Sequence, residues 1–401
     1  MLDTGDTAFM LVATALVMIM TPGLAFFYGG LVSRKNVLTI MMQSYVSMGV
    51  TTILWVTVGY SLCFSGGAGG IIGNLDLMFL KGIGINELYP KLDIPVLLFV
   101  VYQMMFAVIT PALITGAFAN RITFKAYLIF LVAWQLLVYF PFVHMIWGGG
   151  MLSEWGALDF AGGIVVHALA GMAALASVLY VGKRNVQDSG AHNVPFVALG
   201  AALLWFGWFG FNAGSELAVD GITAVAFINT QIAAAFAAIT WLLLAWNYDG
   251  KPSFVEMLIG MIAGLATITP AAGFVSPQSA MLIGVAAGAV CYFAVVLRKK
   301  YELDDALDVW GVHGVGGALG IVMLGVLAST KVNANGADGL ISGSTDFFVA
   351  QVSALVLACI WAFAFTYGML WGIDNLTPVR VTEETERNLD ESLHGESAYT
   401  E

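Results

Sequence analysis

Two histidines lie in long uncharged stretches of the sequence, where an ionisable side chain is costly unless it has a function. His167 lies in Asp159-Phe-Ala-Gly-Gly-Ile-Val-Val-His167, and His313 lies in Asp308-Val-Trp-Gly-Val-His313. A neutral imidazole has one donor and one acceptor nitrogen and titrates near neutral pH, so two of them together can hold or relay a proton. The alternative is a buried histidine bonded to a backbone carbonyl or a hydroxyl. A metal site is disfavoured, because no cysteine or carboxylate is expected at the same depth.

Asp159 and Asp308 stand at the predicted starts of the two histidine-bearing helices. A carboxylate at a helix start accepts hydrogen bonds from the free backbone N–H groups and is favoured by the helix dipole. We place this capping role first for both residues. Asp159 could also bias the outer mouth of a pore towards cations.

Aromatic side chains are concentrated in three short clusters. A cation can be held by the faces of such rings together with a hydroxyl acceptor. Packing is the alternative explanation for most aromatic stretches, so density alone does not establish a site. The clusters are Tyr102–Phe106, which contains Gln103, His144–Gly150, which contains Trp147, and Trp205–Ser215.

The elements that must position these side chains are membrane-spanning helices. The chain is 59% hydrophobic and 10% charged, whereas soluble domains have roughly 25% charged residues. A spanning helix needs about 20 apolar residues, so each uncharged run holds one span, except Met257–Leu297, which holds two and breaks near Pro270 and Pro277. The run Asn36–Leu75 counts once, because it ends in the glycine-rich loop Ser65–Gly70. The expected total is eleven spans.

The distribution of basic residues predicts the orientation. With an odd number of spans the termini lie on opposite sides, and most of the 15 Lys and Arg residues fall on the side of the C-terminal tail. We therefore expect an outer N-terminus and a cytoplasmic C-terminus, with the first span retained, since the chain opens with Asp3 and Asp6 rather than a basic segment. The exceptions are Lys81, Lys91 and Lys331.

Two units are expected along the chain, a membrane domain over residues 1–374 and a polar, acidic cytoplasmic tail over 375–401. Nothing in the charge pattern supports nucleic-acid binding. The first five and next five spans each end in a histidine-bearing, glycine-rich helix, and five spans per repeat require the halves to be inverted. Inverted repeats place a site at their interface near the bilayer midplane, where His167 and His313 would meet.

Several blocks of the sequence resemble the ammonium transporter family, the Amt/Mep/Rh proteins, along essentially the whole chain. They are Pro22–Gly30, Asp159–Gly163 with His167, Gly207–Ser215 and Asp308–Gly317. The resemblance implies an all-α fold of eleven spans in two inverted five-helix halves plus a last helix, assembled as a homotrimer. It also implies a multi-pass protein of a prokaryotic plasma (inner) membrane that serves nitrogen uptake.

The resemblance also implies roles for individual residues. Phe106, Trp147 and Ser215 are similar to the family's outer recruitment site for ammonium, and Phe106 and Phe211 to its stacked phenyl gate. His167 and His313 match the twin-histidine pair, Asp159 the essential acidic residue, and Gln103 a residue near the outer vestibule. Trp147 and Ser215 are typical of the Amt branch rather than the Rh branch. Tyr102 stands where a phenylalanine is familiar, a difference that does not change the assignment of the pore residues.

The implied function is a transporter or channel, not an enzyme, that recruits ammonium, deprotonates it and conducts ammonia while the proton moves separately. No cofactor or metal is implied. Methylammonium is a candidate second substrate, and the tail suggests gating by a PII-type signalling protein, against a simple solvated tail. A sensor on the same scaffold would bind ammonium without flux, and a membrane enzyme would need a nucleophile or metal constellation that the sequence lacks.

Overall fold

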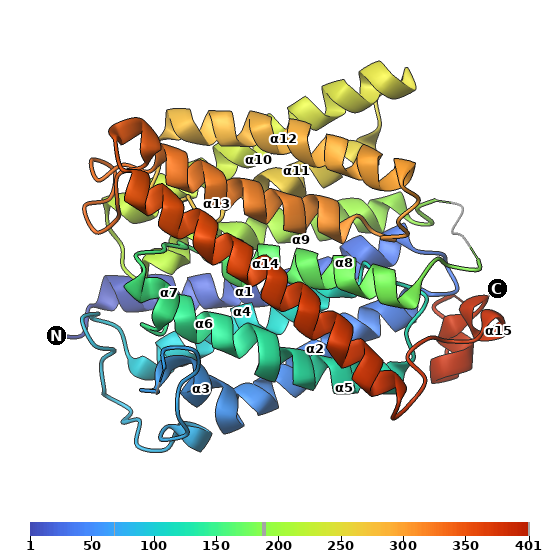
Figure 1. Ribbon diagram of the computed structural model, residues 1–401, viewed down its shortest axis with the longest axis horizontal. Coiled ribbons are helices and arrows are strands. Elements are labelled where there is room, and N and C mark those ends of the chain that lie inside the picture. Colours follow the sequence, from blue (N-terminus) through green and yellow to red (C-terminus); the bar gives the residue numbers. More distant parts are fainter. Residues whose placement is uncertain (68, 187–189, 400–401) are drawn as a thin grey trace.

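The apolar runs of the first half of the chain fold as helices, because a backbone in lipid must satisfy its own hydrogen bonds. The computed structural model describes residues 1–67, 69–186 and 190–399, and its helices lie side by side in one bundle (Figure 1). The first half contains α1 (Thr4–Leu31), α2 (Val37–Leu54), α3 (Tyr60–Phe64), α4 (Val96–Ile114), α5 (Phe124–Trp134), α6 (Phe140–Ile146), α7 (Met151–Glu154) and α8 (Leu169–Val181).

The second half of the chain includes a long helix near its C-terminal end that crosses the bundle obliquely (Figure 1). Its helices are α9 (Val194–Ala213), α10 (Gly221–Asp249), α11 (Phe254–Ile268), α12 (Pro277–Lys300), α13 (Val315–Leu327), α14 (Thr345–Asp374) and α15 (Glu383–Glu386). Wide, π-type turns join α2 to α3 and α5 to α6, so each pair forms one continuous span.

Ten helical segments among the described residues are long and apolar enough to cross a membrane, which confirms the multi-span fold. The eleventh predicted span is α11, which has only 15 residues. It ends at Ile268, and the chain turns through Pro270 before Ser276 caps α12 and Pro277 opens it. Helix α3 ends at Phe64, ahead of the predicted glycine-rich loop, of which residue 68 lies outside the described residues.

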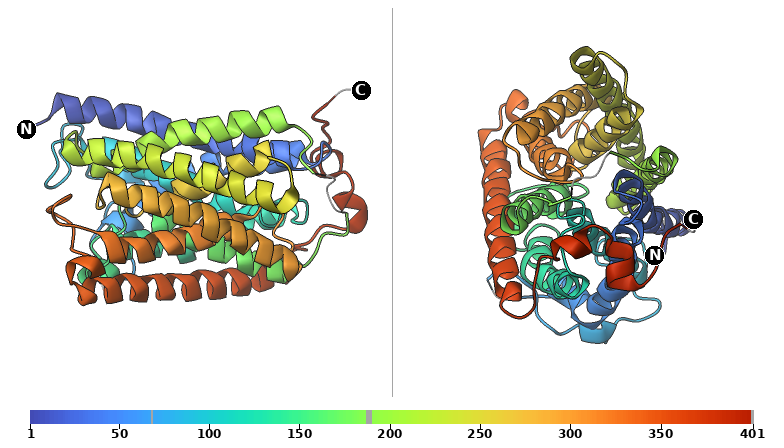
Figure 2. Two further views of the ribbon diagram at one scale, coloured as in Figure 1. Left: turned by 90° about the horizontal axis from the view of Figure 1, so that it is seen from above. Right: turned by 90° about the vertical axis from the view of Figure 1, so that its right-hand side faces the viewer.

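The two halves meet along α1 and α9, where glycines allow the backbones to come close. A Cβ atom at Gly200 would lie 2.2 Å from the backbone nitrogen of Phe27, and one at Gly30 would lie 2.6 Å from the carbonyl oxygen of Asn193. Small residues at such positions favour helix association in lipid. The end-on view of Figure 2 shows α14 running along the flank of both halves.

The two histidine-bearing segments cross at a second glycine contact. His167 lies in a wide turn, Gly163–Ala168, at the start of α8, and His313 lies in another, Trp310–Gly314, at the start of α13. A Cβ atom at Gly171 would lie 2.0 Å from the Cα atom of Gly314. The segments start at opposite ends of the bundle, as expected of an inverted pair, and the close crossing brings their histidines together.

The tail is docked against the end of the bundle and is not simply solvated. Asp390, which is 2% exposed, accepts hydrogen bonds from the backbone nitrogens of Leu38 (3.0 Å) and Thr39 (2.8 Å) at the start of α2. Glu386 accepts one from the backbone nitrogen of Val186 (2.9 Å). Composition could not reveal this docking, because both acids bind backbone N–H groups of the bundle, which no charge pattern marks.

Candidate functional site

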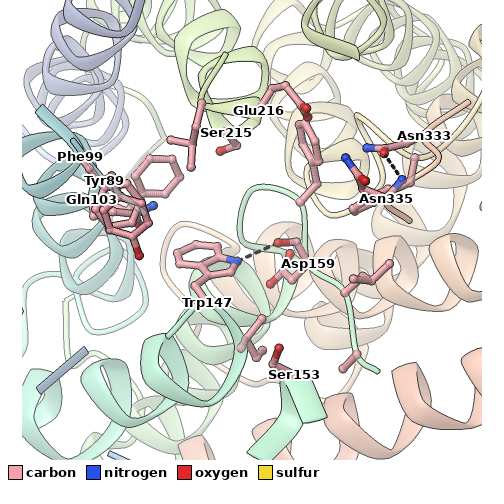
Figure 3. A pocket seen from close by; sticks show the side chains of 17 residues that line it. Tyr89, Phe99, Gln103, Trp147, Ser153, Asp159, Ser215, Glu216, Asn333 and Asn335 are labelled. Atoms are coloured by element: carbon pink, nitrogen blue, oxygen red, sulfur yellow. Dashed lines mark hydrogen bonds between the residues drawn. The ribbon is translucent and has the colours of Figure 1, made fainter. Parts of the chain in front are cut away.

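A cavity of 380 Å³ opens at the end of the bundle that holds α7. We call it the vestibule, and Figure 3 shows its lining. Seventeen residues line it, none of them Lys, Arg or His, while two carry carboxylates. The polarity of the vestibule therefore favours a cation. The lining includes Gln103, Phe106, Trp147, Asp159, Ser215 and Glu216.

The vestibule brings together the three predicted recruitment residues from three elements. Phe106 lies on α4, Trp147 directly follows α6, and Ser215 lies in the short turn after α9. The rings of Phe106 and Trp147 meet edge to face, with centroids 5.8 Å apart and an angle of 84° between their planes. The Trp147 Nε1 group donates to the carbonyl oxygen of Asp159 (2.8 Å), which fixes the indole at the wall. A small cation can touch ring faces and a hydroxyl here.

Two phenyl rings, tilted against each other, close the floor of the vestibule. Phe106 and Phe211 have ring centroids 4.3 Å apart at 35°, and each side chain is 1% exposed. Behind them lies an apolar cavity of 20 Å³, lined in part by Phe211, Trp208, His167 and His313. That volume accommodates about one molecule of the size of water. Whatever passes the rings must therefore be small and largely stripped of its hydration shell.

His167 and His313 form a direct pair in this narrow cavity. Their Nδ1 atoms are 3.2 Å apart, and their ring planes are 18° from parallel. One Nδ1 must donate and the other accept, so the Nε2 of the donor ring is an acceptor and the Nε2 of the other ring carries a proton. The Nε2 of His167 is buried and has no partner among the described residues. A neutral pair thus presents one donor and one acceptor to a guest.

Successive ring contacts connect the vestibule to the histidines. Phe106 contacts Trp147 on one side and Phe211 on the other, and the Phe211 ring lies 6.1 Å from His167 at 26°. Trp208 also stacks on His167, at 5.5 Å, while its indole donates to Thr269 Oγ1 (2.9 Å). Sequence reasoning placed Trp208 in an aromatic cluster but gave it no role, since aromatic residues are frequent throughout these helices.

Asp159 holds the start of the His167 helix. Its Oδ1 accepts from the backbone nitrogens of Gly162 (2.9 Å) and Gly163 (2.6 Å), and its Oδ2 from those of Ile164 (2.8 Å) and Val165 (3.1 Å). Four successive N–H groups are satisfied by one carboxylate that is 5% exposed. Asp159 also lines the vestibule, but these bonds engage both of its oxygens. The geometry supports the capping role.

The matching cap of the other half is Asp305, and the prediction of Asp308 was wrong. Asp305 accepts from the backbone nitrogens of Val309 (3.1 Å) and Trp310 (2.7 Å). Burial, aided by the charge of Asp308, raises the pKa of Asp305 to about 6. Asp308 has a positive φ of 57° and pairs instead with Arg298 (2.5 Å). The signal was available, because Asp159 and Asp305 each precede their histidine by eight residues.

Two other residues singled out from the sequence have clear positions. His144 donates through Nδ1 to the carbonyl oxygen of Cys63 (3.0 Å) and lines neither cavity, so it is a packing histidine. The Tyr102 hydroxyl lies 3.2 Å from Ser215 Oγ. Tyr102 therefore touches the candidate site, although sequence reasoning assigned it no role there.

Comparison with known proteins agrees with this geometry. The sequence model described as "Ammonium Transporter Family" matches residues 8–399. An ammonium transporter of Bacillus subtilis (strain 168) is 46% identical over 401 residues, covering 99% of both chains. The chain belongs to the ammonium transporter family. It is therefore a multi-pass membrane protein of a transporter family and not an enzyme, as the sequence predicted.

Solved structures of this family share the fold. The crystal structure of Saccharomyces cerevisiae Mep2 is similar with a TM-score of 0.88 and 34% identity, covering 96% of this chain and 88% of that chain. A structure described as a sensor Amt protein is also similar, with a TM-score of 0.88, 28% identity and coverage of 96% of each chain. The same fold is thus found in Mep2 and in a protein described as a sensor.

Proposed function

We propose that this chain takes up ammonium across the plasma membrane of a prokaryote, recruiting it in the vestibule, deprotonating it and conducting ammonia past the histidine pair. The observation that carries the proposal is the continuous line of contacts from Trp147 through Phe106 and Phe211 to a directly bonded pair, His167 and His313. The three recruitment residues supply ring faces and a hydroxyl acceptor for the cation.

The narrow apolar cavity favours a neutral guest. Moving a bare monovalent cation into a low-dielectric interior costs tens of kcal/mol by idealised estimates, whereas a desolvated cation–π contact returns about 2 kcal/mol. The aromatic residues can therefore hold ammonium but cannot carry it through as an ion. Ammonia is neutral and has the size that a cavity of 20 Å³ admits. Potassium has no proton to lose, so the same route excludes it.

The histidine pair is suited to move the proton that ammonium leaves behind. Its single shared hydrogen bond can be donated by either Nδ1. When the Nε2 of the donating ring takes up the proton of ammonium, the shared proton can move to the other Nδ1 and the second ring can release its own Nε2 proton, so that one proton crosses the pair and the two Nε2 atoms exchange their donor and acceptor roles. Such an exchange passes charge along the pore without moving a heavy atom. The guest ammonia can donate to one Nε2 and accept from the other.

Ammonium-evoked current tests the proposal directly. Purified protein in liposomes is placed on a solid-supported membrane and given pulses of ammonium or potassium. Saturable current for ammonium alone is the expected result. If neither ion gives current, a stopped-flow assay of internal pH separates electroneutral ammonia passage from a sensor, and the absence of both signals would contradict the transport proposal.

Loss of the Ser215 hydroxyl is expected to weaken recruitment. Ser215→Ala removes one hydrogen-bond acceptor for a charged guest, worth about 1.5 kcal/mol, so the half-saturating ammonium concentration should rise about tenfold. The maximal rate should change little. Ser153→Ala is the matched control, because Ser153 also lines the vestibule but lies outside the recruitment trio. An unchanged half-saturation in Ser215→Ala would remove the serine from the site.

Glu216 should attract cations to the vestibule. It lines the cavity, and its carboxylate has no hydrogen bond or ion pair within the described part of the chain. Glu216→Gln is expected to raise the half-saturating concentration about twofold at low ionic strength, with the difference vanishing near 1 M salt, where the Debye length falls to about 3 Å. Glu154→Gln, an exposed carboxylate on α7 outside the cavity lining, should have no effect. Salt-independent loss in Glu216→Gln would argue for a structural role.

We further propose the orientation, assembly and regulation that the sequence suggested. The docked tail lies at the end of the bundle where most basic residues gather, which supports a cytoplasmic location for that end. Homotrimer formation, transport of methylammonium and contact with a PII-type signalling protein rest on family membership alone. The division into a membrane domain over 1–374 and a tail over 375–401 is part of the same proposal.

A further inference from the structure

The Tyr102 hydroxyl connects the helix that carries Phe106 to the end of the helix that carries Phe211 and to the turn that holds Ser215. Tyr102 lies on α4 and is fully buried. Its Oη atom lies 2.9 Å from the carbonyl oxygen of Gly210, 3.1 Å from that of Phe211 and 3.2 Å from Ser215 Oγ. One hydroxyl thus meets three polar atoms around the end of α9.

The hydrogen bonds around Ser215 decide which way its hydroxyl proton points. The Ser215 hydroxyl donates to the Phe211 carbonyl oxygen (2.8 Å), and the Tyr102 hydroxyl has the Gly210 carbonyl oxygen as its nearest acceptor. The serine proton has two possible acceptors, the Phe211 carbonyl oxygen and the Tyr102 hydroxyl oxygen, and both lie on the side away from the vestibule. The serine oxygen therefore keeps lone pairs for the vestibule.

An acceptor is what a donor-only guest requires. Ammonium carries four N–H donors and no lone pair, so a serine that donated into the cavity would repel it. A free hydroxyl can rotate to either role. The contacts of Tyr102 and Phe211 remove that freedom before the guest arrives, which lowers the cost of binding.

We propose that Tyr102 is a positioning residue of the recruitment site, which holds Ser215 as a hydrogen-bond acceptor for ammonium. The inference rests on the proposed function and deepens it. Gly214 supports it independently, since a Cβ atom there would lie 2.7 Å from Tyr102 Oη and 2.8 Å from the Cβ atom of Ala13. The tyrosine hydroxyl is thus enclosed on a side where no larger residue fits.

Tyr102→Phe tests the inference by removing only the hydroxyl. We expect a half-saturating ammonium concentration about three- to tenfold higher, the loss expected of one neutral hydrogen bond, with a maximal rate within about twofold of the wild type. Tyr127→Phe is the matched control, because the buried Tyr127 hydroxyl donates to the carbonyl oxygen of Gln43 (2.7 Å) away from both cavities. The control should keep the wild-type half-saturation.

A double variant separates positioning from a structural role. If Tyr102 acts through Ser215, adding Tyr102→Phe to Ser215→Ala should weaken half-saturation no further. If Tyr102→Phe raised the half-saturating concentration by the same factor in the Ser215→Ala background as in the wild type, only this inference would be overturned. The same holds if Tyr102→Phe kept the wild-type half-saturation while Ser215→Ala was weakened. A wild-type protein without transport would overturn the proposed function, and a Ser215→Ala variant with wild-type half-saturation would overturn the serine's recruitment role. Each of these last two results overturns the inference as well.

Discussion

His167→Ala is expected to lose ammonium current by at least about tenfold or to admit potassium. The substitution removes one half of the hydrogen-bonded pair and leaves His313 without its partner at 3.2 Å. Without the relay, proton-coupled movement stops. A positioned proton-transfer group contributes a factor of about 10² or more to the rate of comparable reactions. If the enlarged cavity fills with water, cations can pass without deprotonation. The measurement is current on solid-supported membranes with ammonium and potassium pulses.

Three further variants make this result specific. His313→Ala should behave like His167→Ala, and the double variant should be no worse than either, because members of one unit are not additive. His144→Asn keeps a donor for the Cys63 carbonyl and should leave current and selectivity unchanged, since His144 lies outside both cavities. Wild-type current with wild-type exclusion of potassium in His167→Ala would mean that the pair is not the relay.

Much of the fold follows from the sequence because the bilayer imposes it. Long uncharged runs must become helices, and the repeated pattern of an aspartate, glycines and a histidine indicated where two helices would meet. The pairing of His167 with His313 could be expected on these grounds. The short α11 could not, since the end of its helix depends on how the turn through Pro270 packs rather than on hydropathy.

The details of the site depended on contacts that periodicity does not encode. Asp308 is nearer to its helix than Asp305 in the sequence. Because Asp308 has a positive φ and pairs with Arg298, the helix is capped by Asp305 instead. Tyr102 gave no signal beyond one hydroxyl in an aromatic cluster, because its partners lie more than 100 residues away, at the end of α9 and in the turn that follows it. Only the folded structure, in which the Tyr102 side chain on α4 reaches the end of α9, showed that this hydroxyl lies beside Ser215.

Asp159→Asn is expected to reduce the maximal transport rate strongly, by about 30-fold or more, at every salt concentration. The amide keeps one oxygen acceptor but turns its NH₂ group towards two of the four backbone N–H donors that the carboxylate satisfies. Each buried donor left unpaired costs about 1–3 kcal/mol. The His167 helix and the indole of Trp147, which is held by the Asp159 carbonyl, should shift together. Initial rates over a range of ammonium concentrations measure the effect.

The same experiment separates the two roles considered for this carboxylate. If Asp159 mainly attracted cations, Asn would raise the half-saturating concentration at low salt and leave the maximal rate intact. Asp305→Asn is the matched variant, because Asp305 caps the other histidine segment at the opposite end of the bundle and lines neither cavity. A cap acts by holding a histidine helix, so both variants should lose maximal rate. A salt-dependent shift confined to Asp159→Asn would instead make the vestibule's charge its main contribution.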